Sequence, residues 1–246
     1  MVLVTGDRDS YQLVRDLDAS KRVILDALLK LLREQGIRLL TYEELSPEDR
    51  SWLREYYHDN IFPLVTPQAM DPAHPFPFIS NLSLNLIAQV VYPGKAGKTG
   101  LARVKVPVGE GVPRFLPLPG RNDFVVLEDV VRNNLDMLLP DMEILGCYMF
   151  RVTRNANTER DEEHADDLMS LIESELRDRR FAPIVRLQVQ GDMDETTRGM
   201  LTSELGLDES DVFIAGDTML AMRDLFQISS LDIPELRDPP HAPIDH

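Results

Sequence analysis

Apolar side chains near the start of the chain recur with the period of an α-helix. They stand three, four or seven residues apart, which keeps them on one side: Leu13, Leu17, Ile24, Leu28 and Leu31. This pattern predicts a helix from Arg8 to Gln35, ended by Gly36. At 1.5 Å per residue the helix is roughly 40 Å long. Its apolar stripe is therefore expected to need a partner surface beyond this short region.

A second helix is expected from Ser46 to His58, because Ser46 can cap it and Pro47 suits its first position. Prolines then crowd the stretch from Pro63 to Pro77, where each fixes φ and removes a hydrogen-bond donor. The chain is expected to cross this stretch as an extended connector. We therefore expect three parts: residues 1–60, residues 61–233 and a proline-rich linker over residues 234–246.

Alternation from Leu82 to Val90 predicts a strand with one buried apolar face and one polar face, the latter formed by Ser83, Asn85 and Gln89. Residues 101–106 predict the returning strand of a hairpin. Similar patterns predict strands at 124–127, 143–153 and 184–190, and helices at 128–139, 159–180, 195–205 and 218–226. The expected fold is α+β: a helical N-terminal segment followed by a mixed α/β head domain with a mainly antiparallel sheet flanked by helices.

Composition narrows the class of protein. The 246 residues carry a formal net charge of −16, and 43% are hydrophobic. This balance excludes a disordered tail, and it excludes a protein that coats nucleic acid, because the overall field repels phosphate backbones. No apolar run reaches the roughly 18 residues of a membrane span. A single cysteine, Cys147, cannot form an internal disulfide, so a cytoplasmic location is expected.

Common catalytic motifs are missing from the sequence: it has no GxxxxGK[ST], GxGxxG, GxSxG, HExxH or CxxC. We therefore expect no catalytic and no metal-ligating residue in this chain. His164 lies among carboxylates, which favours a solvated first helical turn over a metal site. Cys147 in an apolar strand favours a small buried side chain over a nucleophile. For His74, a proline-stiffened connector that docks Phe76 and Phe78 is favoured over catalysis.

One segment opposes the overall charge. Between Pro93 and Asn122 six basic residues face one acid: Lys95, Lys98, Arg103, Lys105, Arg114 and Arg121 against Glu110. Arg103 and Lys105 stand two apart on the returning strand, so one polyanion can contact both, although lysines on a strand face also prevent sheets from pairing edge to edge. Arg151 and Arg154 form a weaker pair. The candidate phosphate contacts are therefore Arg103, Lys105, Arg114, Arg151 and Arg154.

A long motif covers residues 63–86: PLVTPQAMDPAHPFPFISNLSLNL. Further stretches follow it in order, at residues 102–107, 113–115, 150–154 and 231–240. Together they resemble the head domain of bacterial polyphosphate kinase, and the resemblance spans nearly the whole chain from about Leu13 onward. It implies that residues 1–60 are the end of a helical N-terminal domain and residues 61–233 a head domain.

The resemblance implies a parent enzyme that reversibly transfers the terminal phosphate of ATP to polyphosphate through a phosphohistidine, with Mg²⁺ as cofactor. The catalytic domains of that family, which carry a His-x-Lys histidine, are expected outside this chain, so the chain alone is expected to be inactive. Its implied roles are association into a dimer or tetramer through the head domain and shaping of the substrate route. Membrane association of the parent enzyme stays open. The alternative is a naturally short, non-enzymatic oligomerisation or binding module derived from the same domain.

Overall fold

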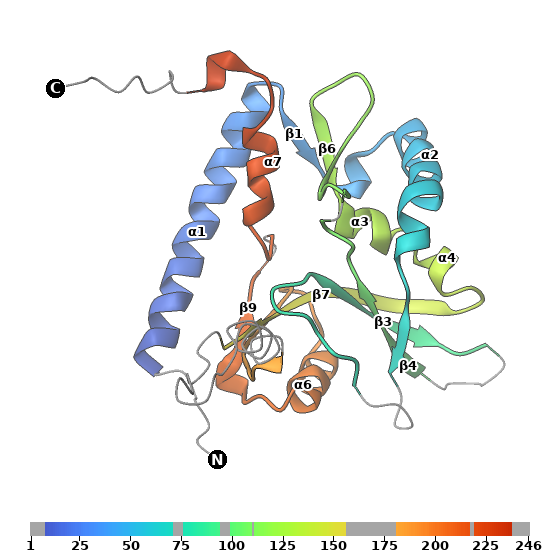
Figure 1. The fold of residues 1–246 in the computed structure, drawn as a ribbon, viewed down its shortest axis with the longest axis vertical. Helices are drawn as coiled ribbons and strands as arrows, with labels where there is room; N and C mark the ends of the chain where they lie inside the picture. The colour runs from blue at the N-terminus through green and yellow to red at the C-terminus, as the bar shows by residue number, and fades with distance from the viewer. Residues whose placement is uncertain are drawn as a thin grey trace, which may run out of the picture.

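The computed structural model describes residues 8–70, 76–93, 99–109, 111–155, 181–216 and 219–237. Its larger sheet has six strands in the order β2-β4-β3-β7-β8-β9, and a smaller one has the order β1-β6-β5 (Figure 1). The strands are β1 (Arg38–Leu40), β2 (Gln68–Met70), β3 (Asn85–Val91), β4 (Thr99–Lys105), β5 (Phe115–Pro117), β6 (Asp123–Val126), β7 (Glu143–Arg154), β8 (Ile184–Val189) and β9 (Val212–Ile214). Neighbouring strands are antiparallel except β8 with β9 and β1 with β6, which confirms the expected α+β fold.

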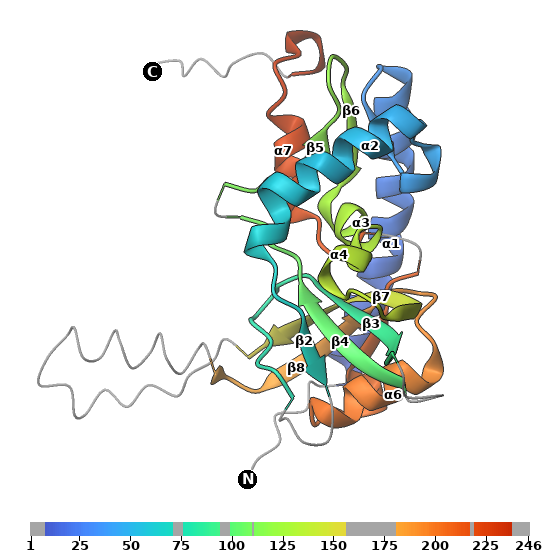
Figure 2. The same cartoon turned by 90° about the vertical axis from the view of Figure 1, so that its right-hand side faces the viewer.

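Helices cover both faces of the larger sheet (Figure 2). The described helices are α1 (Arg8–Glu34), α2 (Pro47–Tyr56), α3 (Leu127–Arg132), α4 (Leu135–Leu138), α6 (Glu195–Glu204) and α7 (Phe226–Ser229). On one face Leu201 of α6 packs in a cluster with Ile87 of β3. On the other face Leu53 of α2 and Val131 of α3 share a larger cluster with Leu86 of β3. The sheet is thus a middle layer between helices.

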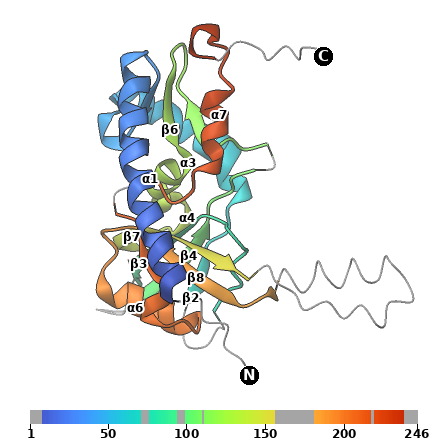
Figure 3. The ribbon, with the colours of Figure 1, turned by 90° about the vertical axis from the view of Figure 1, so that its left-hand side faces the viewer.

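The first helix confirms its prediction. α1 ends at Glu34, and Gly36 follows with φ of +77°, a left-handed conformation that glycine adopts without strain. One side of α1 packs on the chain: Leu25 is buried, and the ring of Tyr11 lies 5.4 Å from that of Phe213. In Figure 3 no described element lies over the opposite side. The residues of the predicted stripe are 41–67% exposed: Leu13, Leu17, Ile24, Leu28 and Leu31.

The second helix also begins as predicted. The hydroxyl oxygen of Ser46 accepts a hydrogen bond from the backbone N–H of Asp49 at 3.1 Å. Two further turns follow α2 directly: a π turn (η2, Tyr57–Ile61) and a 3-10 turn (η3, Phe62–Leu64). The edge strand β2, which the proline pattern did not predict, follows. Buried apolar side chains on both sides of residue 61 share one cluster, and the division of the chain at that residue stays a prediction.

The strand at 82–90 was expected to have one buried face and one polar face, but its polar face is enclosed as well. Asn85 is fully buried, and the amide nitrogen of Gln89 donates to Asp194 and Thr197 at 2.9 and 2.5 Å. β3 lies between β4 and β7 in the sheet, with helices on both faces, so even its polar residues are enclosed. The strand begins at Asn85 and not at Leu82, whose backbone φ of +59° lies outside the extended range of a strand.

The helix expected at 128–139 is broken into α3 and α4. The side-chain amides of Asn133 and Asn134 each donate to a backbone oxygen four residues earlier, at 2.8 Å. These bonds compete with the hydrogen bonds that would continue the helix. The sequence pattern showed the apolar period here but did not show this competition.

The helix expected at 218–226 was wrong as well. Residues 223–225 form a 3-10 turn (η6), and α7 covers only Phe226–Ser229. Just before them, the backbone oxygens of Leu220 and Ala221 accept hydrogen bonds from Arg151 and Arg114. Those oxygens are bound by distant side chains instead of by a helix. The helix expected at 159–180 lies outside the described residues, whereas α6 and Gly206 at its end confirm the prediction for 195–205.

Candidate functional site

Two of the predicted phosphate contacts lie together at the edge of the larger sheet. Arg103 and Lys105 occupy one side of β4 and line a groove of about 350 Å³. One wall comes from β2, where Gln68 stands opposite Arg103 in the strand register. Another comes from the turn at Gly109, whose φ of +101° favours glycine. The two cations therefore share one face, as the strand pattern predicts.

Arg103 is not an open surface side chain, contrary to the expectation for that strand face: it is 6% exposed. Its Nε and Nη2 donate to Oδ1 of Asn85 at 2.9 and 2.7 Å, and its Nη1 donates to Oε1 of Gln68. Both acceptors are neutral, and burial lowers the pKa of this guanidinium. In the part of the chain that the structure describes, no carboxylate contacts Arg103 or the exposed Lys105.

Asn85 orients this arrangement. Its amide nitrogen donates to the backbone oxygen and the hydroxyl of Ser83, at 2.9 and 3.1 Å. The amide oxygen is then left for Arg103. Sequence reasoning placed Asn85 on a polar strand face but did not assign it or Gln68 to the site. The sequence offered one signal for Asn85: it stands on the polar face that alternation assigns to its strand.

Arg114 lies elsewhere, in the core, and is 1% exposed. Its Nη2 donates to the carboxylate of Glu128 at 2.5 Å, and its Nη1 donates to Asp224 at 3.2 Å and to the backbone oxygen of Ala221 at 2.5 Å. These bonds tie α3 to the segment that contains α7. The guanidinium of Arg114 is bonded to these internal partners, and the structure does not bring Arg114 to the groove.

Arg151 and Arg154 do not form a joint site. Arg151 donates to the backbone oxygens of Leu82 and Leu220, at 3.1 and 3.2 Å. Arg154 donates to the backbone oxygen of Ile79 at 2.9 Å and lies 4.6 Å from the ring centroid of Phe78. Each side chain thus holds a different pair of loops against β7. The structure brings neither of them to Arg103.

Tertiary pairing neutralises two of the six basic residues between residues 93 and 122. Arg121 pairs with Asp49 and Asp123 at 2.5 and 2.8 Å, and Arg114 pairs as described above. Lys95 and Lys98 lie outside the described residues. Of the described cations in that segment, Arg103 and Lys105 have no acidic partner among the described residues.

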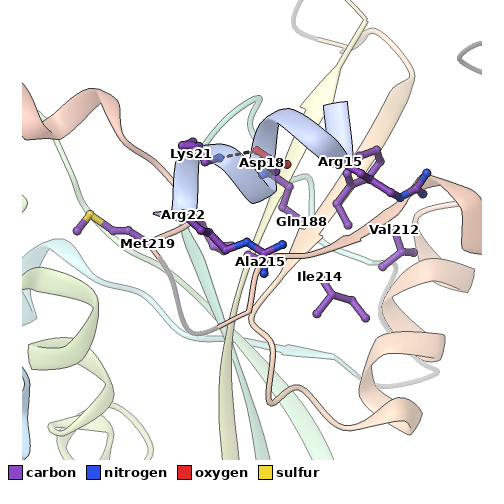
Figure 4. A pocket seen from close by; sticks show the side chains of 11 residues that line it. Arg15, Asp18, Lys21, Arg22, Gln188, Val212, Ile214, Ala215 and Met219 are labelled. Atoms are coloured by element: carbon purple, nitrogen blue, oxygen red, sulfur yellow. Dashed lines mark hydrogen bonds and ion pairs between the residues drawn. The ribbon is translucent and has the colours of Figure 1, made fainter. Parts of the chain in front are cut away.

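A second basic pocket, of about 280 Å³, lies between α1 and the β8–β9 edge (Figure 4). Arg15, Lys21 and Arg22 of α1 line it, but Asp18 stands among them and pairs with Lys21 at 2.5 Å. Arg186 of β8 pairs with the same carboxylate at 3.2 Å. This pocket therefore carries its own counter-charge. Sequence reasoning missed it because its two walls are far apart along the chain.

A larger cavity, of about 450 Å³, lies between α1, β1 and α3. Burial raises the pKa of Asp129, which lines it, to about 6, although the nearby Arg132 cation acts in the opposite direction. Cys147 is close to this region, and burial raises the pKa of its thiol to about 11. A thiol with that pKa is protonated at neutral pH, which fits the expected small buried side chain better than a nucleophile.

The described residues do not fit a magnesium site, since no three acidic, histidine or cysteine side chains among them are grouped to hold a metal ion. His58 is exposed, stacks on Phe62 with ring centroids 6.2 Å apart, and contacts Asp59 at 2.8 Å. The other four histidines, His74 and His164 among them, lie outside the described residues.

Comparison with known proteins assigns the chain to a family. Residues 48–228 match the family described as "Polyphosphate kinase middle domain". The chain belongs to the polyphosphate kinase family. The polyphosphate kinase of Mycolicibacterium gilvum is 41% identical over 227 residues, and that of Aphanizomenon baltica is 42% identical over 231 residues. The resemblance inferred from the proline-rich motif is thereby confirmed.

These relatives are longer than the chain. The matches cover 90% and 89% of this chain but 31% of the M. gilvum protein and 59% of the A. baltica protein. The crystal structure of polyphosphate kinase from Porphyromonas gingivalis matches with a TM-score of 0.72 at 22% identity, over 96% of this chain and 35% of that one. The chain thus has the fold of one part of a polyphosphate kinase. Among its described helices, none has the length and apolar character needed to span a bilayer.

Proposed function

We propose that this chain is the middle part of an enzyme that reversibly transfers the terminal phosphate of ATP to polyphosphate through a phosphohistidine. The family match over residues 48–228 supports this proposal. Phosphoryl transfer requires clustered cations or metal ions and an in-line nucleophile. The described residues offer Arg103 and Lys105, two cations without an acidic partner among them, and no group suited to a metal ion. We therefore assign the transfer step, with ATP and Mg²⁺ binding, to regions of the longer relatives that this chain does not match.

The role proposed for the chain itself is subunit association, in a dimer or tetramer, together with shaping of the substrate route. The exposed apolar stripe of α1 supports association, because a contiguous apolar surface of this kind marks an interface in a water-exposed protein. The unpaired thiol of Cys147 fits a reducing compartment, and we place the protein in the cytoplasm.

A polymerisation assay tests the assignment of chemistry. The 246-residue chain, given ATP, Mg²⁺ and a polyphosphate primer, is expected to form no polymer and to take no label from ATP carrying radioactive terminal phosphate. The full-length M. gilvum polyphosphate kinase serves as the positive control. Label on a side chain of the 246-residue chain would contradict the proposal, since it would show a phosphoryl acceptor within these residues.

A chimera tests family function directly. The matching segment of the M. gilvum enzyme is replaced by this chain, and ATP-dependent polymer formation is measured. Retained polymerisation is expected if the chain is a working middle part of such an enzyme. A folded chimera without activity would instead favour a non-enzymatic oligomerisation or binding module.

A further inference from the structure

The groove on the surface of β2 and β4 holds positive charge that no described acidic residue balances. Arg103 and Lys105 have no acidic partner within the described ranges, although the whole chain carries a net charge of −16. Buried charges are normally paired, because an isolated ion loses its hydration. Arg114, which is also buried, follows this rule with Glu128 and Asp224. Arg103 departs from it, so a counter-charge from a bound anion would stabilise it.

Arg103 also retains free hydrogen-bond donors. A guanidinium has five N–H groups, and three of them donate to Asn85 and Gln68, which leaves one on each Nη atom. Lys105 adds an ammonium group on the same side of β4, and Thr66 lines the same groove. Such a set of donors suits a group with several anionic oxygens, because charge-assisted bonds from arginine and lysine to phosphate are short and strong.

The walls of the groove narrow the class of ligand. Leu64, Pro107 and Val108 provide aliphatic surface, and none of the described residues that line the groove is aromatic. A nucleotide base usually stacks on an aromatic ring when a protein binds it without base-specific contacts. The groove therefore favours a bare phosphate chain over a nucleotide.

We propose that this groove is an oxyanion site in which Arg103 and Lys105 hold phosphate groups of a linear oligophosphate. Asn85 and Gln68 act as positioning residues, since they hold the guanidinium while leaving its charge uncompensated. The inference that the groove binds an oxyanion depends only on the residues of the groove. The choice of an oligophosphate as the natural ligand rests on the proposed function.

The first test is a titration of the 246-residue chain by calorimetry, with tripolyphosphate, ATP and orthophosphate as separate ligands. Tripolyphosphate is expected to bind, more weakly as salt is added, because ions screen the attraction. ATP is expected to bind no more tightly than tripolyphosphate, and orthophosphate less tightly. Tighter binding of ATP would overturn the choice of a bare phosphate chain, and no binding of tripolyphosphate at millimolar concentration would overturn the site.

The second test uses variants chosen to change the charge in the groove without disturbing the fold. Gln68→Glu places a carboxylate against the guanidinium of Arg103, and Lys105→Glu reverses an exposed charge. Each is expected to weaken tripolyphosphate binding about tenfold or more, the effect of losing one charged hydrogen bond. Lys30→Glu, at an exposed position on α1, changes the net charge as Lys105→Glu does and is expected to change affinity by less than about twofold.

The outcomes separate the site from the proposed function. Equal affinities of the Gln68→Glu, Lys105→Glu and Lys30→Glu variants would overturn the site, whatever the chimera does. An inactive chimera together with the expected loss of binding in Gln68→Glu would overturn the enzymatic role and leave the oxyanion site standing. Thermal unfolding of each variant identifies a loss of binding that comes from misfolding, and Gln68→Glu is expected to unfold at or above the wild-type temperature.

Discussion

Tyr57 carries a fully buried hydroxyl that has no hydrogen-bond partner in the described structure. A buried polar group without a partner costs its lost hydration. Tyr57→Phe removes that group and keeps the ring, so it is expected to raise the free energy of unfolding by about 1 kcal/mol. Urea denaturation measures the change. Tyr56→Phe, at the half-exposed last position of α2, is the control and is expected to have little effect. A destabilised Tyr57→Phe variant would show that the hydroxyl has a partner.

Asp129 is expected to make stability depend on pH. Burial raises its pKa to about 6 in the folded state, above the ordinary value of 3.8, so between about pH 4 and 6 the folded protein holds a proton that the unfolded chain releases. The stabilisation is present at low pH and is lost as the pH rises through 6. At pH 8, Asp129→Asn is expected to raise the free energy of unfolding by roughly 1–3 kcal/mol, with a smaller gain at pH 5.

Asp136 provides a control of opposite sign. A hydrogen bond from Arg54 lowers the pKa of Asp136, so its stabilisation is present at neutral pH and is lost as the pH falls through the folded value. Asp136→Asn is therefore expected to lower stability slightly at pH 7 and not at low pH. Denaturation curves at pH 3, 5, 7 and 8 measure both variants, since the loss for Asp136 lies below its ordinary pKa of 3.8. A gain for Asp129→Asn that does not grow with pH would contradict the assignment.

At the scale of elements, the two sides of α1 have different surroundings. Its packed side contacts β9 through the ring of Tyr11, and its other side exposes the apolar stripe. We expect the purified chain to self-associate through this stripe at tens of micromolar, and the double variant Leu17→Lys with Ile24→Lys to shift it toward monomer. Light scattering measures the mass. The control is Gln12→Lys with Ala19→Lys, which adds the same charge away from the stripe; a monomeric wild-type chain would contradict the prediction.

At the scale of the whole molecule, Arg114 joins segments that are far apart in sequence. Its partners Glu128 and Asp224 lie 14 and 110 residues away. Arg114→Met leaves the buried carboxylate of Glu128 unpaired, which is expected to cost about 3–5 kcal/mol of stability. Urea denaturation measures the loss, and hydrogen exchange is expected to rise in residues 219–237. Adding Glu128→Gln to the variant is expected to restore part of the stability; unchanged exchange in that segment would contradict this role.

Local patterns predicted the elements whose ends depend on neighbouring residues. Ser46 and Gly36 marked the start of α2 and the end of α1, because a capping hydroxyl and a left-handed glycine act within one turn. The hairpin of β3 and β4 followed from alternation in the same way. The break between α3 and α4 escaped prediction, since it comes from amide side chains that compete with the backbone and not from a change in apolar period.

The sequence by itself determined the family, the periods of the main helices and strands, and the short spacing that brings Arg103 and Lys105 to one face. Only the tertiary structure decided which of the candidate cations stay free. Arg114, Arg151 and Arg154 are held by partners that lie 14 to 110 residues away, whereas Arg103 meets two neutral amides. The reason is physical: strand geometry is set by adjacent residues, but the charge that remains at a site is set by contacts that form only when distant segments pack.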